Sequence, residues 1–255
     1  MSGFDESQYG KGLRPRDWAS YPLGTVSWAP RMAAQAAFKL VPRDEWKDRI
    51  AAKTEEKSWL WDLMQAAGMQ RKNQRNYSWC HSFSVTGAAE VAIVASGKPY
   101  VKLSPSSIAG PITNWNSGRG MPILDPLRHA QHHGIAEEVF IPELTDDRRK
   151  LTPEAIDNAR SHKVRGYDVD AKAWDEIVTC ALLNIPTCWG VYHDWGHAIY
   201  GGVKLLYVNG VLHSQYVNSW GDGYTDGTNC GPGCGLVREG GPHYPEEAFA
   251  ILAAN

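Results

Sequence analysis

Three residues spread along the chain, Cys80, His197 and Asn218, are of the types that nucleophilic catalysis by a thiol requires. A thiol attacks as its thiolate, and a helix N-terminus or a nearby imidazolium favours that anion. His197 could accept the thiol proton and later donate one to a leaving amine, while Asn218 would hold the imidazole through its other nitrogen. Gln74 lies six residues before Cys80, where its side-chain amide and the Cys80 backbone N–H could face a developing oxyanion. We therefore predict these four residues as catalytic.

Each of these residues also has a simpler interpretation when it is taken alone. An isolated cysteine is more often a small buried hydrophobe than a nucleophile. His197 could be a core histidine, and Asn218 could form a turn. It is their occurrence in the order Cys, His, Asn, together with Gln74, that favours the catalytic interpretation.

Three further groups of residues are of types that bind metals, but each lacks part of a metal site. His129, His132 and His133 have helical spacing, yet no acidic or cysteine partner is nearby, so a solvated helix face is favoured. Cys230 and Cys234 match half of a metal knuckle, and a loop disulfide or two free thiols is the expected state. An acidic loop lacks the glycine and the terminal glutamate of an EF-hand (Asp222, Asp226, Asn229). We therefore expect no metal and no cofactor.

The element that must position Cys80 is predicted to be a helix. Apolar residues recur from Phe83 to Val94 before Gly97 stops the pattern, which places Cys80 at the helix N-terminus. Other helices are predicted over residues 45–67, with a break in the charged middle, and over 104–109, 125–133, 153–160 and 171–184.

The chain after Pro186 has the pattern of strands, over residues 187–192, 197–208 and 211–220. The dipeptide Asn209-Gly210 is a strong signal for a two-residue hairpin turn. The two sides of this hairpin differ in length, so we expect a β-bulge to absorb the difference, at Gly201-Gly202. A helix-rich first half and a strand-rich second half predict an α+β fold with two lobes.

Composition limits the kinds of partner. The chain has 26 Lys and Arg against 28 Asp and Glu, so no basic field points to nucleic acid or to an acidic membrane surface. No apolar run approaches the roughly 20 residues that span a bilayer. The first residues are acidic where a secretory signal is basic, and five cysteines make an odd count that argues against a disulfide framework. We therefore expect a soluble, cytoplasmic protein without nucleic-acid or membrane partners.

Four segments of the chain together resemble the papain-like cysteine peptidases. In that family a glutamine precedes the nucleophile by six residues and an aromatic residue, here Phe83, follows it by three. The segments 218–221 (Asn-Ser-Trp-Gly), 103–105 (Leu-Ser-Pro) and 118–122 (Gly-Arg-Gly-Met-Pro) also match, so the resemblance is collinear from about Leu40 to Gly240.

This resemblance implies a papain-like fold, with a helical N-terminal lobe (about 72–165), an antiparallel β lobe (about 166–255) and the active site between them. It implies hydrolysis of peptide bonds through a Cys80 acyl-thioenzyme, with His197 as general acid and base. A peptide or protein substrate would lie in the cleft against four residues: Gly120, Met121, Pro122 and Trp220.

The chain also departs from the family pattern around the nucleophile. Tyr77 replaces a half-cystine, so the disulfide that the family forms from that loop to the glycine-rich strand is not expected, and His81 replaces a tryptophan. No inhibitory pro-segment of the usual length is recognisable. Activity would then be limited by compartment, by a partner or by the N-terminal arm.

The domain prediction is an N-terminal arm over residues 1–40 and a peptidase domain over 41–255. The arm mixes glycine, proline and aromatic residues without a sustained period, and we expect it to pack on its own body or to make assembly contacts with another subunit. The alternative function is a catalytically inactive papain-like subunit, structural or binding, of a larger assembly such as a phage particle.

Overall fold

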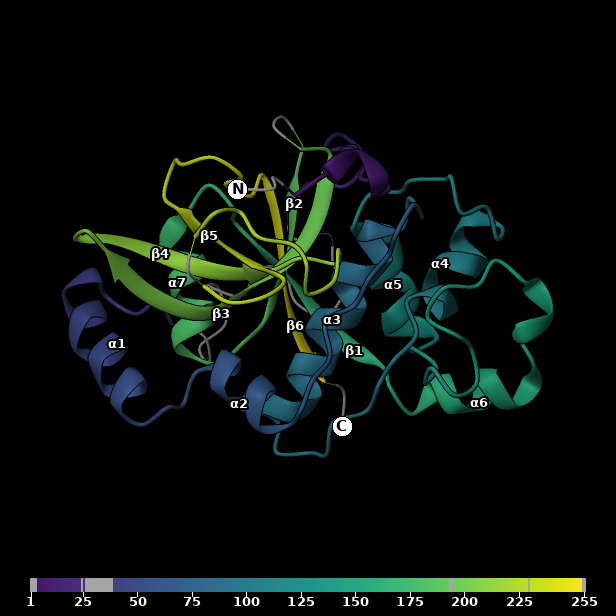
Figure 1. Ribbon diagram of the computed structural model, residues 1–255, viewed down its shortest axis with the longest axis horizontal. Coiled ribbons are helices and arrows are strands. Elements are labelled where there is room, and N and C mark those ends of the chain that lie inside the picture. Colours follow the sequence, from purple (N-terminus) through teal and green to yellow (C-terminus); the bar gives the residue numbers. More distant parts are fainter. Residues whose placement is uncertain (1–3, 24, 26–38, 193–194, 229, 254–255) are drawn as a thin grey trace.

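The computed structural model describes residues 4–23, 25, 39–192, 195–228 and 230–253. Helices and one antiparallel sheet form an α+β architecture, as the sequence predicts (Figure 1). Within the described residues the helices are α1 (Trp46–Glu55), α2 (Leu60–Ala66), α3 (Cys80–Ala95), α4 (Ser106–Thr113), α5 (Leu124–His132), α6 (Pro153–Arg160) and α7 (Trp174–Leu182), with the short 3-10 turns η1 (Glu6–Gln8), η3 (Arg43–Glu45) and η4 (Arg148–Lys150).

The described strands form one sheet in the order β1-β6-β2-β3-β4-β5, and each neighbouring pair is antiparallel. They are β1 (Val164–Val169), β2 (Thr187–Val191), β3 (His197–Val208), β4 (Val211–Val217), β5 (Cys234–Arg238) and β6 (Glu247–Ala253). Strand β6, the last in sequence, lies between β1 and β2, one place in from the β1 edge of the sheet.

Helix α3 joins the helical side of the molecule to the sheet. Figure 1 shows α4, α5 and α6 on one side of α3 and the sheet on the other. Ser84 donates to the Ile199 carbonyl oxygen at 2.5 Å, and Gly87 faces the Tyr200 ring, which a Cβ at this position would approach to 2.4 Å. The missing side chain at Gly87 therefore lets β3 pack directly on the helix that begins with Cys80.

The hairpin of β3 and β4 contains the predicted bulge. Gly201 pairs with Tyr216, whereas Lys204 pairs with Gln215, so the register shifts between Gly201 and Lys204. Gly202 has a φ of 72°, a left-handed conformation that glycine adopts without steric cost. The bulge keeps the start of β3 level with the end of β4, which is where His197 and Asn218 lie.

Most of the predicted helices are confirmed with shifted ends. The predicted helix over residues 45–67 is broken into α1 and α2, α6 occupies its predicted residues, and α4 continues four residues beyond its predicted end. Three strands were not predicted: β1, β5 and β6. Among the described residues, no helix has both the length and the apolar character needed to cross a bilayer.

The N-terminus of α6, outside the candidate active site, gives a stability prediction. Thr152 accepts a hydrogen bond from the Ala155 backbone N–H at 3.3 Å, and Pro153 occupies the first helical position. Because the hydroxyl satisfies an otherwise unpaired helix donor, we expect Thr152→Ala to lower the free energy of unfolding by about 1 kcal/mol in urea titrations. Thr152→Ser retains the hydroxyl and is the control. Equal stability of the two variants would contradict this account.

Candidate active site

Cys80 is the first residue of α3 and is fully buried. Its sulfur interacts with backbone groups from two distant segments, Gly12 in the arm and Ala198 on β3. Ala198 directly follows His197, so the helical side and the sheet meet at the sulfur. The N-terminal position in α3 suits a thiolate, because the helix dipole is positive there.

His197 opens β3 and is hydrogen-bonded to Asn218, the residue that follows β4. The imidazole Nε2 lies 2.8 Å from Asn218 Oδ1, which also accepts the Ser219 backbone N–H at 2.7 Å. Because an amide oxygen only accepts, the ring carries its proton on Nε2 and keeps the lone pair on Nδ1. Within the described part of the chain, the buried Nδ1 has no hydrogen-bond partner. This is the nitrogen left available as a base.

Gln74 comes from the loop before α3 and is anchored to the segment after β4. Its backbone N–H donates to the Ser219 carbonyl at 2.7 Å, its side-chain Oε1 accepts from the Ser219 hydroxyl, and Asn73 pairs with Trp220 in an isolated bridge. The Gln74 side-chain amide donates to two carbonyl oxygens, that of Gly10 at 2.7 Å and that of Tyr77 at 2.9 Å. The predicted oxyanion donor is therefore held rigidly, with one N–H directed at the arm.

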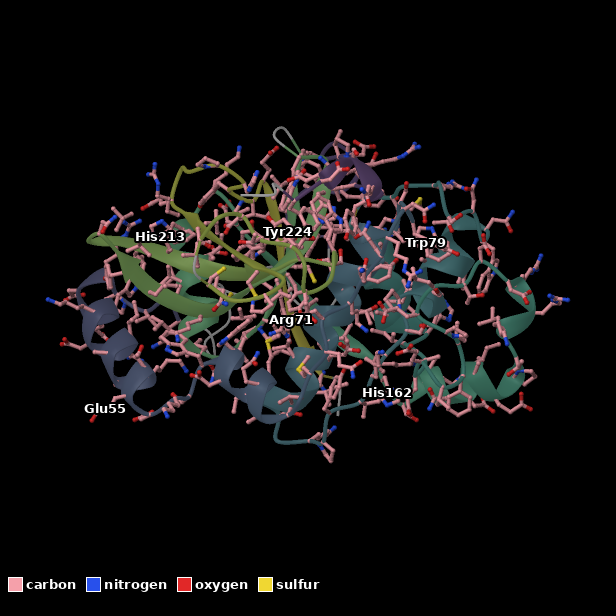
Figure 2. All side chains as sticks on the ribbon, viewed as in Figure 1. Glu55, Arg71, Trp79, His162, His213 and Tyr224 are labelled. Atoms are coloured by element: carbon pink, nitrogen blue, oxygen red, sulfur yellow. The ribbon has the colours of Figure 1, made fainter. Side chains whose placement is uncertain are left out.

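Aromatic rings enclose the His197–Asn218 pair. The centroid of Trp220, which is fully buried, lies 4.5 Å from that of His197, and the Trp195 ring lies edge-on to His197 at 4.9 Å. On the arm side, Tyr9 stacks on Trp220 at 5.3 Å. In Figure 2 the labelled Tyr224, whose ring is 5.5 Å from Trp220, belongs to the sheet side, and Trp79 belongs to the helical side. These rings exclude water from the hydrogen bond between His197 and Asn218.

The N-terminal arm crosses this site. In Figure 1 its purple turn η1 lies at the top of the view, near β2 and the upper part of the helices. Leu13 pairs with Met121 in a parallel bridge: the Met121 N–H donates to the Gly12 carbonyl at 3.0 Å, and the Arg14 N–H donates to the Met121 carbonyl at 3.3 Å. Leu13 also donates to the Gly196 carbonyl at 3.3 Å. The arm is thus hydrogen-bonded to both sides of the site.

Two glycines allow this close approach of the arm. A Cβ at Gly12 would lie 1.8 Å from the Ser78 carbonyl oxygen, and a Cβ at Gly10 would lie 2.2 Å from that of Tyr77. On the segment that faces the arm, a Cβ at Gly120 would lie 2.0 Å from the Gly12 carbonyl oxygen. Of the predicted substrate contacts, Gly120 and Met121 therefore touch the arm, whereas Pro122 accepts the Asp125 N–H.

Burial favours the neutral forms of both Cys80 and His197. It raises the pKa of the Cys80 thiol to about 11, and interactions with the backbone of Gly12, Ala198 and His81 oppose this in part. Burial also lowers the pKa of His197 to about 4, against the opposite effect of the Asn218 hydrogen bond. With the arm in place, both the Cys80 thiol and the His197 imidazole are neutral at pH 7. His81, the departure from the family pattern, is likewise buried, and burial lowers its pKa to about 3.

The other groups considered from the sequence lie outside this site. His132 and His133 are exposed, as a solvated face predicts, but His129 is half-buried, and burial lowers its pKa to about 4. Cys230 and Cys234 are free thiols. In the acidic loop, Asp226 accepts the Leu236 N–H, and Asn229 lies outside the described residues. Among the described residues, no cluster of three or more His, Cys, Asp or Glu side chains has metal-binding geometry.

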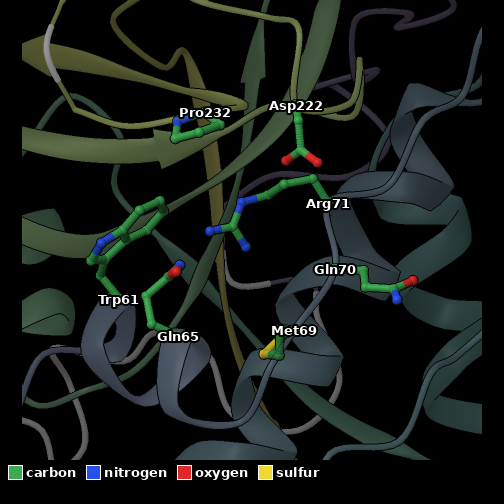
Figure 3. A pocket seen from close by; sticks show the side chains of 7 residues that line it. All are labelled: Trp61, Gln65, Met69, Gln70, Arg71, Asp222 and Pro232. Carbon is green, nitrogen blue, oxygen red and sulfur yellow. The ribbon is translucent and has the colours of Figure 1, made fainter.

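A separate cavity of about 430 Å³ lies between α2 and the loop after β4 (Figure 3). Arg71 reaches into it, with its guanidinium 4.6 Å from the Trp61 ring and Asp222 above it in the view. None of the four predicted catalytic residues lines this cavity.

Comparison with solved structures finds papain-like cysteine proteases. Xylellain, a cysteine protease from Xylella fastidiosa, is 17% identical, with a TM-score of 0.58 over 73% of this chain and 84% of that chain. Procathepsin L 3 from the larval midgut of Tenebrio molitor is 16% identical, with a TM-score of 0.61 over 72% and 66%. A mite allergen structure, from a study of Blo t 1 and Der p 1, is 14% identical, with a TM-score of 0.62 over 98% and 81%.

No protein-family model and no curated protein matches the chain. The similarity to solved structures is one of fold, and the chain has the papain-like fold that the sequence resemblance implies.

Proposed function

We propose that this protein is a cysteine peptidase that hydrolyses peptide bonds through an acyl-thioenzyme at Cys80. The observation that carries the proposal is the state of His197, which holds its proton on Nε2 against Asn218 and keeps Nδ1 without a partner among the described residues, next to the strand residue that contacts the Cys80 sulfur. A core histidine would be expected to use both ring nitrogens, since buried polar atoms are nearly always hydrogen-bonded.

In the proposed reaction, His197 Nδ1 takes the thiol proton while the sulfur attacks the substrate carbonyl carbon. The resulting oxyanion accepts hydrogen bonds from Gln74 Nε2 and from the Cys80 backbone N–H. The C–N bond then breaks as His197 returns the proton to the leaving amine, which leaves a thioester on Cys80. Water, deprotonated by His197, hydrolyses the thioester and restores the thiol. Gly120, Met121, Pro122 and Trp220 remain the proposed substrate contacts.

The arm would hold this peptidase in an inactive form. The Gly10 carbonyl oxygen accepts the Gln74 N–H that the reaction needs, and the Gly12 backbone lies on the Cys80 sulfur. A substrate carbonyl and the arm cannot occupy the same donor together. We therefore expect hydrolysis to require displacement of residues 9–14 from the cleft.

The test is labelling with a peptidyl epoxide, read by intact mass and peptide mapping. Cys230 must be removed first, because it is only half-buried and a hydrogen bond from Cys234 lowers its pKa. In Cys230→Ser carrying Gly12→Val, which expels the arm, we expect one label, on Cys80. The matched Cys80→Ser protein should take up none.

Two outcomes would remove the peptidase proposal. Equal labelling with and without Cys80 would show that this thiol is not the nucleophile. Suppose instead that small alkylating agents label Cys80 but no peptide of a diverse library forms an acyl intermediate on it. That result would favour the alternative of an inactive papain-like binding subunit.

A further inference from the structure

A buried guanidinium site lies at the end of the path that the arm takes through the cleft. Arg16 is only 3% exposed, and its Nη1 lies 2.7 Å from Asp168 Oδ1 and 3.5 Å from Glu247 Oε1. The guanidinium carbon lies 5.5 Å from the centroid of the Phe249 ring. A cation is thus held by two carboxylates and an aromatic face, which together suit a planar charged group.

The walls of this site belong to the body of the protein. Asp168 on β1 is directly paired with Phe249 on β6, and Glu247 lies two residues before Phe249 on the same strand. The Tyr192 hydroxyl donates to Glu247. Burial raises the pKa of Glu247 to about 7, and the Arg16 charge and the Tyr192 hydrogen bond act against this shift. Two carboxylates buried in adjacent strands favour a cation beside them, because an uncompensated buried charge is costly.

Further contacts of the Arg16 side chain come from the arm. Its Nε and Nη2 donate to the carbonyl oxygens of Tyr21 and Pro22, each at 2.6 Å, and Trp18 covers the outer side at 4.5 Å. These contacts leave with the arm, whereas Asp168, Glu247 and Phe249 stay. The body alone therefore offers a site for positive charge at the end of a planar or long side chain.

The position of this site relative to the proposed catalytic residues allows it to bind a side chain of a peptide in the cleft. Arg16 is three residues beyond Leu13, which pairs with Met121 and hydrogen-bonds to Gly196 beside His197. A segment of extended chain in the cleft that reaches Met121 can therefore place a side chain between Asp168 and Glu247. Arg14, on the same segment, is exposed and does not enter the site.

We propose that Asp168, Glu247 and Phe249 form a specificity site that selects an arginine, or another long basic side chain, of a peptide bound in the cleft, and that Arg16 occupies it in the arm-closed form. This inference deepens the proposed function and gives its substrate class: peptides with a basic residue near the cleaved bond.

Binding tests the site without relying on catalysis. The probes are synthetic peptides of residues 9–23 with arginine or its neutral isostere citrulline at position 16. The receptor is the full chain carrying Gly12→Val, Arg16→Gln and Cys80→Ser, so that its own arm does not fill the site. We expect citrulline at position 16 to weaken binding by about 30-fold or more, as loss of one partner of a buried charge pair does. Citrulline at position 14 should change the affinity by less than about twofold, since exposed charges contribute little.

The receptor variants Glu247→Gln and Asp168→Asn test whether these two carboxylates bind the arginine. Each variant is expected to reduce the preference for arginine over citrulline at position 16 to a few-fold. The unfolding temperature shows whether each variant folds, and the second variant keeps the test valid if the first does not. Equal binding of the arginine and citrulline peptides to the unsubstituted site, or no binding of either, would overturn the proposal.

Hydrolysis then separates this proposal from the proposed function. With Cys80 restored, peptides carrying a single arginine at successive positions should be cleaved faster than their citrulline counterparts at one position only. Selective binding of arginine peptides without any cleavage would contradict the peptidase proposal and support the basic-residue site. Cleavage at the same rate with arginine and with citrulline would support the peptidase proposal and contradict the basic-residue site.

Discussion

In the Gly12→Val variant, iodoacetamide should alkylate Cys80 about 100-fold faster at pH 7.5 than in the unsubstituted protein. The added side chain has no room, because even a Cβ would lie 1.8 Å from the Ser78 carbonyl oxygen, and this neighbour is backbone that cannot rotate away. The arm must then leave the sulfur. If exposure returns the thiol pKa from about 11 to its ordinary 9, the thiolate fraction rises by about two powers of ten.

The rate is best followed by mass spectrometry of the Cys80 peptide in a Cys230→Ser background. Gly223→Val is the matched control, since a Cβ at Gly223 meets nothing within 4 Å. This control should react at the rate of the unsubstituted protein. Should Gly12→Val keep its fold and react no faster than Gly223→Val, the arm is not what shields the thiol.

The pH profile of the same reaction has a definite sign. The thiolate reacts, and burial raises the pKa of Cys80, so in the closed form the rate should climb about tenfold per pH unit through pH 8–10 and level off near 11. In the open form, His197 regains access to water, and the largest cause of its lowered pKa is removed. The rise should then occur at lower pH, and identical profiles for both forms would contradict the proposed shielding.

Residue types and their order singled out residues that the structure brings together, and local sequence patterns predicted the elements that hold them. Cys80 does begin a helix, and the bulge near Gly202 does bring His197 level with Asn218. These features depend on short stretches of chain, whose apolar periodicity, turn residues and side-chain types can be read directly from the sequence. The Gln74–Ser219 connection could not be derived this way, because it joins segments 145 residues apart.

The parts that the sequence did not predict depend on burial and on long-range pairing. Strand β6 is a short apolar run, and periodicity alone does not distinguish such a run from a buried helical segment. Asp168 and Glu247 were not identified as site residues, although both are buried carboxylates on adjacent strands. The sequence signal for this site is the presence of acidic residues in mainly apolar strands. Their common neighbour Arg16 is far away in the sequence, so the sequence does not show that the three residues meet.

The role of Gln74 can be separated from that of the nucleophile by comparing two reactions of the open form. In a Gly12→Val background, we expect Gln74→Ala to reduce kcat for peptide hydrolysis by about 100- to 1,000-fold, the usual effect of removing one oxyanion donor, with little change in KM. Alkylation of Cys80 by iodoacetamide develops no oxyanion, so its rate should change by less than about threefold.

Ser219→Ala is the control for this comparison, because Gln74 also has a structural connection through its Oε1. Removing the Ser219 hydroxyl loosens the amide but leaves its N–H groups, so kcat should fall far less than in Gln74→Ala. Equal losses in the two variants would mean that Gln74 acts by holding the loop before α3. A parallel loss of alkylation and hydrolysis in Gln74→Ala would place its effect on the thiol, because only the oxyanion interaction is specific to attack on a carbonyl.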